Sequence, residues 1–180
     1  METVKSYENF PVWIVMLSNL VSLFIYGLGF LIMIKLGVIP SLLYLIFVAI
    51  LEFRLLSYHC VNCFYWGKTC GFGKGRLSSV FFKRGDVSKF CAKEFTWKDM
   101  IPDLLVSLIP LATGIYLLIV KFDIIILIAI LLLIILTTAG NGFIRGQLAC
   151  KFCKQRELGC PAEQLFNKKQ KINGDNKIIN

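Results

Sequence analysis

The sequence IIILIAILLLIIL occupies residues 124–136 and consists of Ile, Leu and one Ala. The apolar run continues to about Ile144, which gives about the 20 residues that a helix needs to cross roughly 30 Å of hydrocarbon. The rest of the chain has the same character, because 57% of its 180 residues are hydrophobic and 17% are charged. This composition is too apolar for an ordinary soluble domain. We therefore expect an all-α, polytopic membrane protein.

Three further apolar runs precede the one that ends near Ile144. Since backbone polar groups in lipid must be hydrogen-bonded within their own element, each run is predicted to be a transmembrane helix. Short connections at residues 35–37 and 121–123 join the runs in pairs, which predicts two helical hairpins. The first run is too long for a signal-peptide core, so we expect it to stay in the protein. The four runs are Val12–Ile34, Val38–Leu56, Ile101–Val120 and Ile124–Ile144.

Basic residues are distributed unevenly around these runs. Eighteen of the 20 Lys and Arg residues lie near the N-terminus, around the connection between the hairpins or after the fourth run, whereas Lys35 and Lys121 lie in the hairpin turns. Basic segments stay in the cytoplasm, so we expect a multi-pass protein of the cell membrane with both termini cytoplasmic. The net charge of +9 predicts contact with anionic lipid headgroups. No nucleic-acid-reading motif accompanies the charge, and we expect no nucleic-acid partner.

Six of the seven cysteines form two arrays with one spacing. Cys60, Cys63 and Cys70 form a C-x2-C-x6-C array, and the same array recurs ninety residues later at Cys150, Cys153 and Cys160. Each array follows a predicted hairpin, so we interpret the chain as a diverged duplication. Its halves are residues 1–90 and 91–170, followed by a polar tail at 171–180 that we expect to be disordered. Halves with an even number of spans are parallel, which predicts that both arrays reach the same membrane face.

The two arrays are candidate metal sites. Two Cys residues three positions apart on a turn direct both sulfurs to one side, and a third Cys beyond a loop supplies another tetrahedral ligand. Thiols in a reducing compartment are more often metal ligands or redox groups than disulfides. We expect zinc, held either as two ions or as one shared cluster. The predicted ligands are Cys60, Cys63, Cys70, Cys150, Cys153 and Cys160, with His59 and Cys91 as further candidates and Glu157, Glu163, water or shared thiolates completing the second site.

Two alternative interpretations use the same cysteines. An iron–sulfur centre also takes Cys ligands, and Cys160-Pro161 resembles the Cys-Pro ending of ferredoxin motifs. A metal-free thiol oxidoreductase needs thiolates of lowered pKa, which neighbouring Lys and Arg residues would promote. Enzymes of that class that reside in membranes work on the oxidising side, whereas the basic residues here indicate the reducing side.

The connection between the halves carries two further patterns. Gly71, Gly73 and Gly75 alternate, which permits close approach of the backbone to another element. Residues 77–82, followed by Lys83 and Arg84, are expected to form a short helix lying in the membrane interface.

Charged residues also occur inside the ends of two apolar runs. Glu52 lies near the end of the second run and Arg145 near the end of the fourth. Because a charge close to lipid needs a partner or water, we expect these two side chains to pair.

Together, these patterns predict a membrane protein with a cysteine metal centre facing the cytoplasm. We expect a zinc-stabilised scaffold or adaptor that docks a cytosolic protein, a role that is not enzymatic. The alternative is a membrane-bound iron–sulfur or thiol redox protein that passes electrons to or from the membrane.

Overall fold

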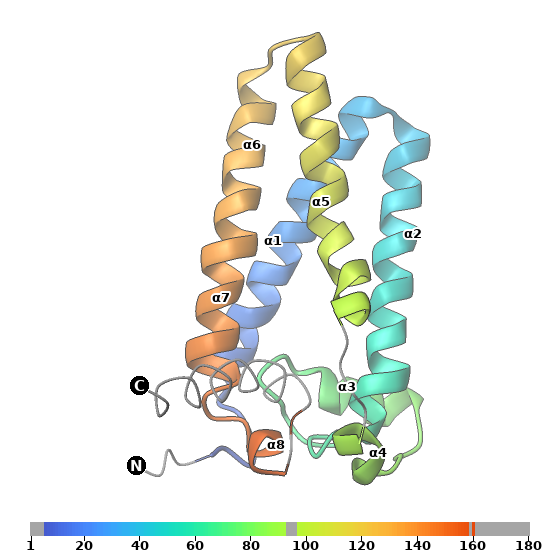
Figure 1. Cartoon of the computed structure of the whole chain (residues 1–180), viewed down its shortest axis with the longest axis vertical. Helices are drawn as coiled ribbons and strands as arrows, with labels where there is room; N and C mark the ends of the chain where they lie inside the picture. The colour runs from blue at the N-terminus through green and yellow to red at the C-terminus, as the bar shows by residue number, and fades with distance from the viewer. Residues whose placement is uncertain (1–5, 93–96, 159, 161–180) are drawn as a thin grey trace, which may run out of the picture.

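The computed structural model describes residues 6–92, 97–158 and 160. In this part of the chain, four long helices form a bundle, and short helices gather at one of its ends (Figure 1). Four segments are long and apolar enough to cross a membrane: Val12–Leu36, Val38–Asn62, Ile101–Val120 and Ile124–Ala149. The four predicted helices are therefore confirmed, each long and apolar enough to cross a membrane. The second and fourth extend beyond their predicted ends.

Each pair of spans is joined by a tight turn at the opposite end of the bundle from the short helices. The first pair contains α1 (Val12–Leu36) and α2 (Val38–Arg54), and the second contains α5 (Trp97–Val120) and α6 (Ile124–Ile135). Gly37, with φ of 146°, reverses the chain between α1 and α2, a conformation that favours glycine. Asp123 caps α6 by accepting the Ile125 N–H at 2.9 Å. Lys35 lies 3.4 Å from Asp123 and links the two turns.

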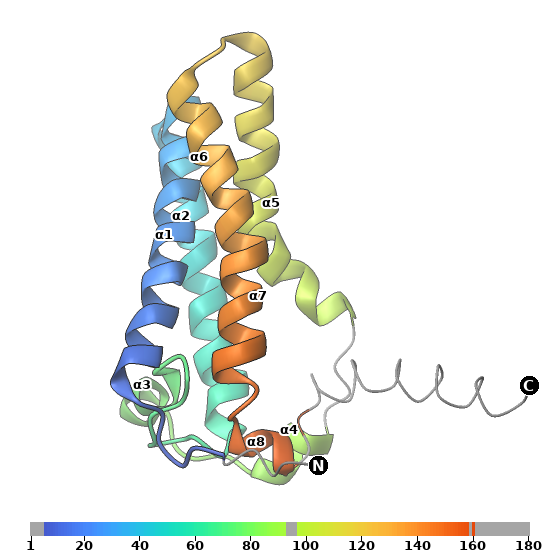
Figure 2. The same ribbon diagram turned by 90° about the vertical axis from the view of Figure 1, so that its left-hand side faces the viewer.

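The second and fourth spans continue as helix through π-helical turns. After α2 come η1 (Leu55–His59), which is π-helical, and η2 (Cys60–Asn62), a 3₁₀ turn. After α6 the span continues through η3, α7 and η4 in one direction (Figure 2). Turns of the π type are rare and occur often beside functional sites. Both cysteine arrays begin where a π-helical turn ends. The bounds in the fourth span are η3 Leu136–Gly140, α7 Asn141–Phe143 and η4 Ile144–Ala149.

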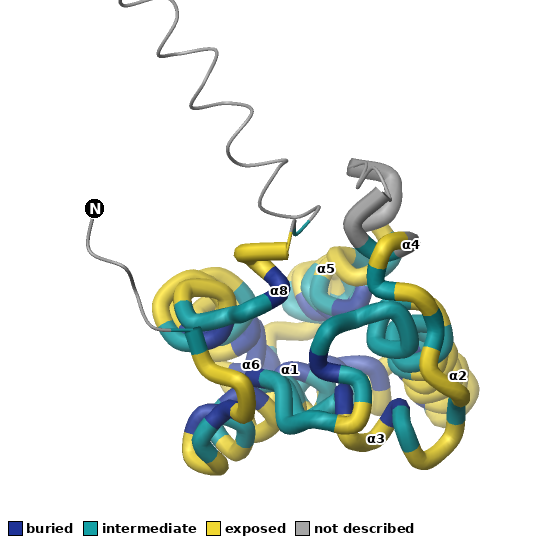
Figure 3. The backbone as a smooth tube through the Cα atoms, turned by 90° about the horizontal axis from the view of Figure 1, so that it is seen from below, coloured by how far each residue is buried: buried dark blue, intermediate teal, exposed yellow. Residues whose placement is uncertain are grey.

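Helix α1 packs against α2, α5 and α6. One buried cluster joins α1 to α6 through residues such as Ile32 and Leu133, and another joins α1, α2 and α5 around Tyr44. Buried positions lie toward the interior of the bundle and exposed ones outward (Figure 3). The outward faces carry large apolar side chains, which a bilayer rather than water accommodates. Examples from the four spans are Leu23, Ile39, Ile119 and Ile125.

A proline in α5 is compensated by a side chain of α2. Pro110 has no N–H, so the carbonyl of Val106 lacks its usual helical partner. The Tyr44 hydroxyl donates a hydrogen bond to that carbonyl at 3.0 Å. Tyr44 also occupies the space beside Gly29 of α1, where a Cβ would clash with its ring. The pair of contacts fixes α2 against both neighbours.

The short helices α3 (Lys74–Phe81), α4 (Val87–Ala92) and α8 (Lys154–Glu157) lie at the end of the bundle where the cysteine arrays begin (Figure 1). The predicted helix near residues 77–82 is present and begins earlier, at Lys74. The N-terminal segment joins this end, because the Tyr7 N–H donates to the Phe152 carbonyl at 2.9 Å. The predicted tail, residues 171–180, lies outside the described residues.

Candidate metal centre

The two C-x2-C segments have the same backbone hydrogen bonds. In the first, the Cys63 N–H donates to the Cys60 carbonyl at 3.3 Å, and Cys153 donates to Cys150 at the same distance. The next bond also recurs, from Trp66 to Cys63 and from Arg156 to Cys153, at 3.1 Å in both. Each segment is therefore a compact turn of the kind that directs two sulfurs to one side.

The approach to each turn is also equivalent. The Cys60 N–H donates back to Leu55, and the Cys150 N–H donates back to Arg145 at 2.8 Å. Both bonds span five residues, as π-helical geometry requires. Cys60 and Cys150 have nearly the same backbone angles, with φ of −68° and −71° and ψ of −31° and −32°. The ninety-residue offset thus applies to local backbone geometry as well as to sequence.

The two turns contact each other through Gln155 of α8. This side chain is 2% exposed, and its Oε1 accepts the Phe64 N–H at 2.8 Å. The same oxygen lies 3.7 Å from the Cys63 Sγ, which donates to it. A buried amide needs such partners because its desolvation costs free energy otherwise. Gln155 therefore joins the second turn to the first.

Tyr65 forms the other connection between the turns. Its ring is 1% exposed and packs with Phe10 and Ile14 in a buried cluster that includes Phe152. Its hydroxyl accepts the Lys154 N–H at 2.9 Å and donates to the Tyr7 carbonyl. One phenol thus joins three segments: the N-terminus, the first turn and the second turn.

Thiols from both arrays lie close enough to influence one another's ionisation. Burial raises the pKa of Cys63 to about 11, and repulsion from Cys70 and Cys160 contributes to the increase. Burial likewise raises the pKa of Cys153 to about 12, with repulsion from Cys63, Cys150 and Cys160. Together with the Gln155 and Tyr65 contacts, this shows that the arrays lie side by side at one end of the bundle.

The predicted ligands differ in their surroundings. Cys60, Cys63, Cys70, Cys153 and Cys160 are partly buried thiols, and Cys150 is exposed. Among the described residues, no three His, Cys, Asp or Glu side chains are arranged to hold a metal ion. His59 ends η1, immediately before the first turn, and Glu157 is exposed in α8. The side chain of Cys91 and the whole of Glu163 lie outside the described residues.

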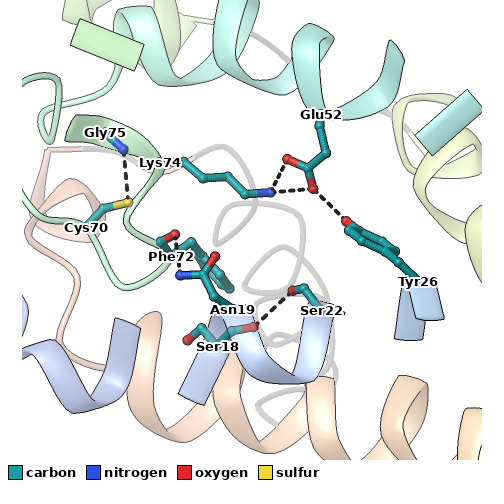
Figure 4. A network of polar contacts seen from close by, with 9 residues as sticks. All are labelled: Ser18, Asn19, Ser22, Tyr26, Glu52, Cys70, Phe72, Lys74 and Gly75. Atoms are coloured by element: carbon teal, nitrogen blue, oxygen red, sulfur yellow. Dashed lines mark hydrogen bonds and ion pairs between the residues drawn. The ribbon is translucent and has the colours of Figure 1, made fainter. Parts of the chain in front are cut away.

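The loop that carries Cys70 lies against α1 and α2 (Figure 4). Lys74, at the end of this loop, forms an ion pair with Glu52 of α2 at 2.6 Å, and the Tyr26 hydroxyl of α1 donates to the same carboxylate at 2.6 Å. The Asn19 side chain donates to the Phe72 carbonyl at 3.2 Å. Backbone and side chains of the loop are thus bonded to both helices of the first hairpin.

These contacts correct the expected pairing of Glu52 with Arg145. Glu52 forms its ion pair with Lys74 instead, because the loop brings that lysine between the helices. Arg145 lies over the Phe72 ring, with its guanidinium carbon 5.5 Å from the ring centroid. A cation over an aromatic face is stabilised by the ring quadrupole. Both charges therefore contact the loop on which Cys70 lies.

The alternating glycines have the role that their spacing indicated. A Cβ on Gly71 would lie 2.9 Å from Ala149, and one on Gly73 would lie 2.9 Å from Val15. Gly73 also has φ of +70°, in the left-handed region. The Gly75 N–H donates to the Cys70 Sγ at 3.4 Å. The glycines thus let the loop approach the first and fourth spans and hold the third thiol.

Sequence reasoning missed Gln155, Tyr65 and Lys74 as parts of this site. Gln155 is an isolated polar residue in a charged segment, and no local pattern distinguishes it. Lys74 is one of many basic residues near the predicted membrane face. The signal that could have identified Lys74 is its position between Gly73 and Gly75, in the segment expected to approach another element closely.

Comparison with known proteins gives no assignment. No family model matches the chain, and neither a curated protein nor a solved structure is significantly similar to it.

Proposed function

We propose that this is an integral membrane protein with a cysteine metal centre facing the cytoplasm, and that zinc binding there stabilises a scaffold for a cytosolic protein partner. The observation that carries the proposal is the convergence of two C-x2-C turns with the same backbone hydrogen bonds. Cysteines spaced in this way on a turn commonly bind zinc through both sulfurs. The two turns come from segments ninety residues apart, which supports a diverged duplication of a unit made of one helical hairpin and one cysteine array.

The cysteine side chains must move closer together when a metal ion binds, because the described thiols do not yet form a complete ligand set. The described thiols interact electrostatically without forming a three-ligand group. In small zinc sites the binding energy itself draws the ligands together, because the apo site is seldom preformed. We expect a bound ion to move the thiols of Cys63 and Cys153 closer to one another.

The raised thiol pKa values argue against the metal-free oxidoreductase. Disulfide exchange requires a thiolate, which a lowered pKa provides. Burial raises the pKa of both Cys63 and Cys153. A zinc or iron–sulfur centre, whose positive charge would offset the cost of burying thiolates, is the better explanation for grouped cysteines in this environment.

Metal analysis of the purified full-length chain tests the proposal. Protein prepared anaerobically in lipid nanodiscs should contain stoichiometric zinc and be colourless. Cys63→Ser and Cys153→Ser should each lose at least half of the bound zinc, since each removes a ligand from one turn. Ser79→Ala, at the same end of the bundle, is the control and should retain all of it.

The outcome also separates the alternative. A brown protein that contains iron and inorganic sulfide would replace the scaffold with the electron-transfer function. Both functions would be contradicted if folded wild-type protein contained no more zinc or iron than the Cys63→Ser/Cys153→Ser double variant.

A further inference from the structure

A second candidate binding site lies at the end of α3, beside the first cysteine turn. A shallow hollow of about 350 Å³ is lined there by Trp66, Ser79, Val80, Phe81, Phe82, Lys83 and Arg84. Lys83 and Arg84 are exposed at its edge. Val80 and Phe81 are 75% and 68% exposed. The hollow therefore combines two cations with a large apolar surface.

The position of the hollow along the second span follows from three contacts. The Phe82 ring packs edge-on against the Phe53 ring of α2, with centroids 5.5 Å apart. The Gly85 N–H donates to the Val61 carbonyl at 3.0 Å, and the Asp86 N–H donates to the Asn62 side chain at 3.0 Å. The chain from Phe82 to Asp86 thus runs beside the last turns of this span. Lys83 and Arg84 are therefore held beside the end of this candidate span.

The apolar surface of the span leads directly into the hollow. Ile46, Ile50 and Phe53 of α2 are 55%, 59% and 61% exposed, on the outward face of the bundle. Phe53 contacts Phe82, which lines the hollow, so apolar contact is continuous from the span to Val80 and Phe81. An acyl chain lying along α2 would bring its headgroup to Lys83 and Arg84.

Two hydrogen bonds hold α3 and Phe82, on one side of the hollow, in place. The Trp66 indole N–H donates to the Phe82 carbonyl at 3.3 Å, and the Ser78 hydroxyl donates to the Leu56 carbonyl at 3.2 Å. These bonds fix α3 and the following residues against η1 and the first cysteine turn. Asp86 lies two residues beyond Arg84, and its carboxylate accepts the Ser88 N–H at 2.9 Å. The local charge at the hollow remains basic.

We propose that this hollow binds the headgroup of an anionic phospholipid, with the phosphate between Lys83 and Arg84 and the acyl chains along Phe53 and Ile50. A basic pair at the hydrocarbon boundary attracts anionic headgroups, and an interfacial helix with exposed apolar residues contacts the chains. The site goes beyond the proposed metal centre and depends on none of its cysteines.

Lipid retention in native mass spectrometry tests this site. The full-length protein is reconstituted in nanodiscs that contain phosphatidylcholine and phosphatidylglycerol, then released and activated stepwise. Wild type should retain phosphatidylglycerol in preference to phosphatidylcholine. In Lys83→Gln/Arg84→Gln, the ratio of retained phosphatidylglycerol to phosphatidylcholine should fall about thirtyfold, equivalent to about 1 kcal/mol for each cation.

Two matched variants make the result specific. Lys121→Gln/Lys151→Gln removes the same charge from other positions and should keep the preference. Lys83→Arg/Arg84→Lys keeps the charge at the hollow, should also keep the preference, and shows that the segment still folds when substituted. Inorganic phosphate at millimolar concentration should not displace the lipid, because it has no acyl chain to contact Phe53.

Equal retention of phosphatidylglycerol by wild type and the Lys83→Gln/Arg84→Gln variant would overturn the proposal. So would displacement by inorganic phosphate, which would assign the hollow to a soluble anion, or an equal loss in the Lys121→Gln/Lys151→Gln variant, which would indicate attraction to net charge alone.

Discussion

Tyr65 shows how a single side chain organises the cysteine end of the protein. Its hydroxyl accepts one hydrogen bond from the Lys154 N–H and donates one to the Tyr7 carbonyl, while its ring is buried. The partners lie 89 and 58 positions away in sequence. A residue with these contacts stabilises the relative position of both arrays without being a ligand.

Tyr65→Phe should destabilise the protein by about 1–3 kcal/mol, because it removes two part-buried hydrogen bonds. Thermal unfolding in nanodiscs measures the loss. Tyr58→Phe is the matched control, since Tyr58 is 70% exposed, and it should change stability little. Equal melting temperatures for both variants would contradict the role of the Tyr65 hydroxyl.

The raised pKa values of Cys63 and Cys153 predict a pH dependence for the metal-free protein. In the unfolded chain these thiols lose their protons near pH 8.5. In the folded protein they keep them until about pH 11 and 12. The unfolded state therefore binds fewer protons above pH 8.5, and the folded state loses stability as the pH rises from there to about 12.

Unfolding by denaturant at pH 7.5, 9 and 10.5 checks this expectation. Stability of the metal-free wild type should fall between pH 9 and 10.5, and Cys63→Ser/Cys153→Ser should show a smaller decrease. A decrease of the same size in the double variant would assign the pH dependence to other groups.

At the scale of elements, the loop from Cys70 to Gly75 connects the membrane helices to the cysteine turns. It is bonded to α1 through Asn19 and to α2 through Glu52. The Lys74 and Glu52 side chains are 19% and 29% exposed. This ion pair is half-buried, so removing one partner leaves the other charge incompletely compensated.

Lys74→Met should destabilise the docked loop by about 1–3 kcal/mol and increase alkylation of Cys70 by maleimide. Glu52→Gln/Lys74→Met should recover part of the loss, because no unpaired charge remains. Peptide mass mapping after a short maleimide pulse measures the reaction at Cys70, with Cys153 as the internal reference.

The ion pair at the opposite end of the bundle is the control for this effect. Lys35 and Asp123 lie 3.4 Å apart, and their side chains are 48% and 29% exposed. Lys35→Met should cost less than about 1 kcal/mol, as for other exposed pairs. Unchanged Cys70 alkylation in Lys74→Met would mean that the ion pair does not hold the loop.

At the scale of the whole molecule, the distribution of basic residues predicts which end of the bundle faces the cytoplasm. The four candidate spans fit a multi-pass membrane protein, and the cysteine turns and hairpin turns lie at opposite ends (Figure 1). The excess of basic residues at the cysteine end predicts that this end is cytoplasmic. The expectation matters for function, because a reducing compartment favours metal-bound thiols over disulfides.

Labelling of intact cells with a membrane-impermeant maleimide tests the orientation. Lys121→Cys, in the turn between α5 and α6, should be labelled from outside, whereas Lys83→Cys should be labelled only after the membrane is opened. Both positions are exposed in the fold, so a difference in labelling reflects the side of the membrane rather than burial. The reverse pattern would place the cysteine turns outside and remove the main argument for a cytoplasmic metal centre.

The spans could be predicted from sequence because hydropathy is a local property; the third has its predicted bounds, and the first begins as predicted and ends two residues later, at Leu36. The second span continued to Asn62 because helical hydrogen bonding, rather than apolar composition, determines where a helix ends. The α3 helix and the close approach at Gly71 and Gly73 also followed from local patterns, because glycine spacing and apolar periodicity act within a few residues.

Within the candidate site, the two cysteine arrays, their matching turns and the alternating glycines could be recognised from sequence, since each depends on residues close together in the chain. The pairing of Glu52 with Lys74 rather than Arg145 could not be recognised in this way, because it arises from packing. Several basic side chains were available, and the choice depends on a loop that lies against α1 and α2. The links made by Gln155 and Tyr65 were decided in the same way, because their partners are brought near by packing of segments about ninety residues apart.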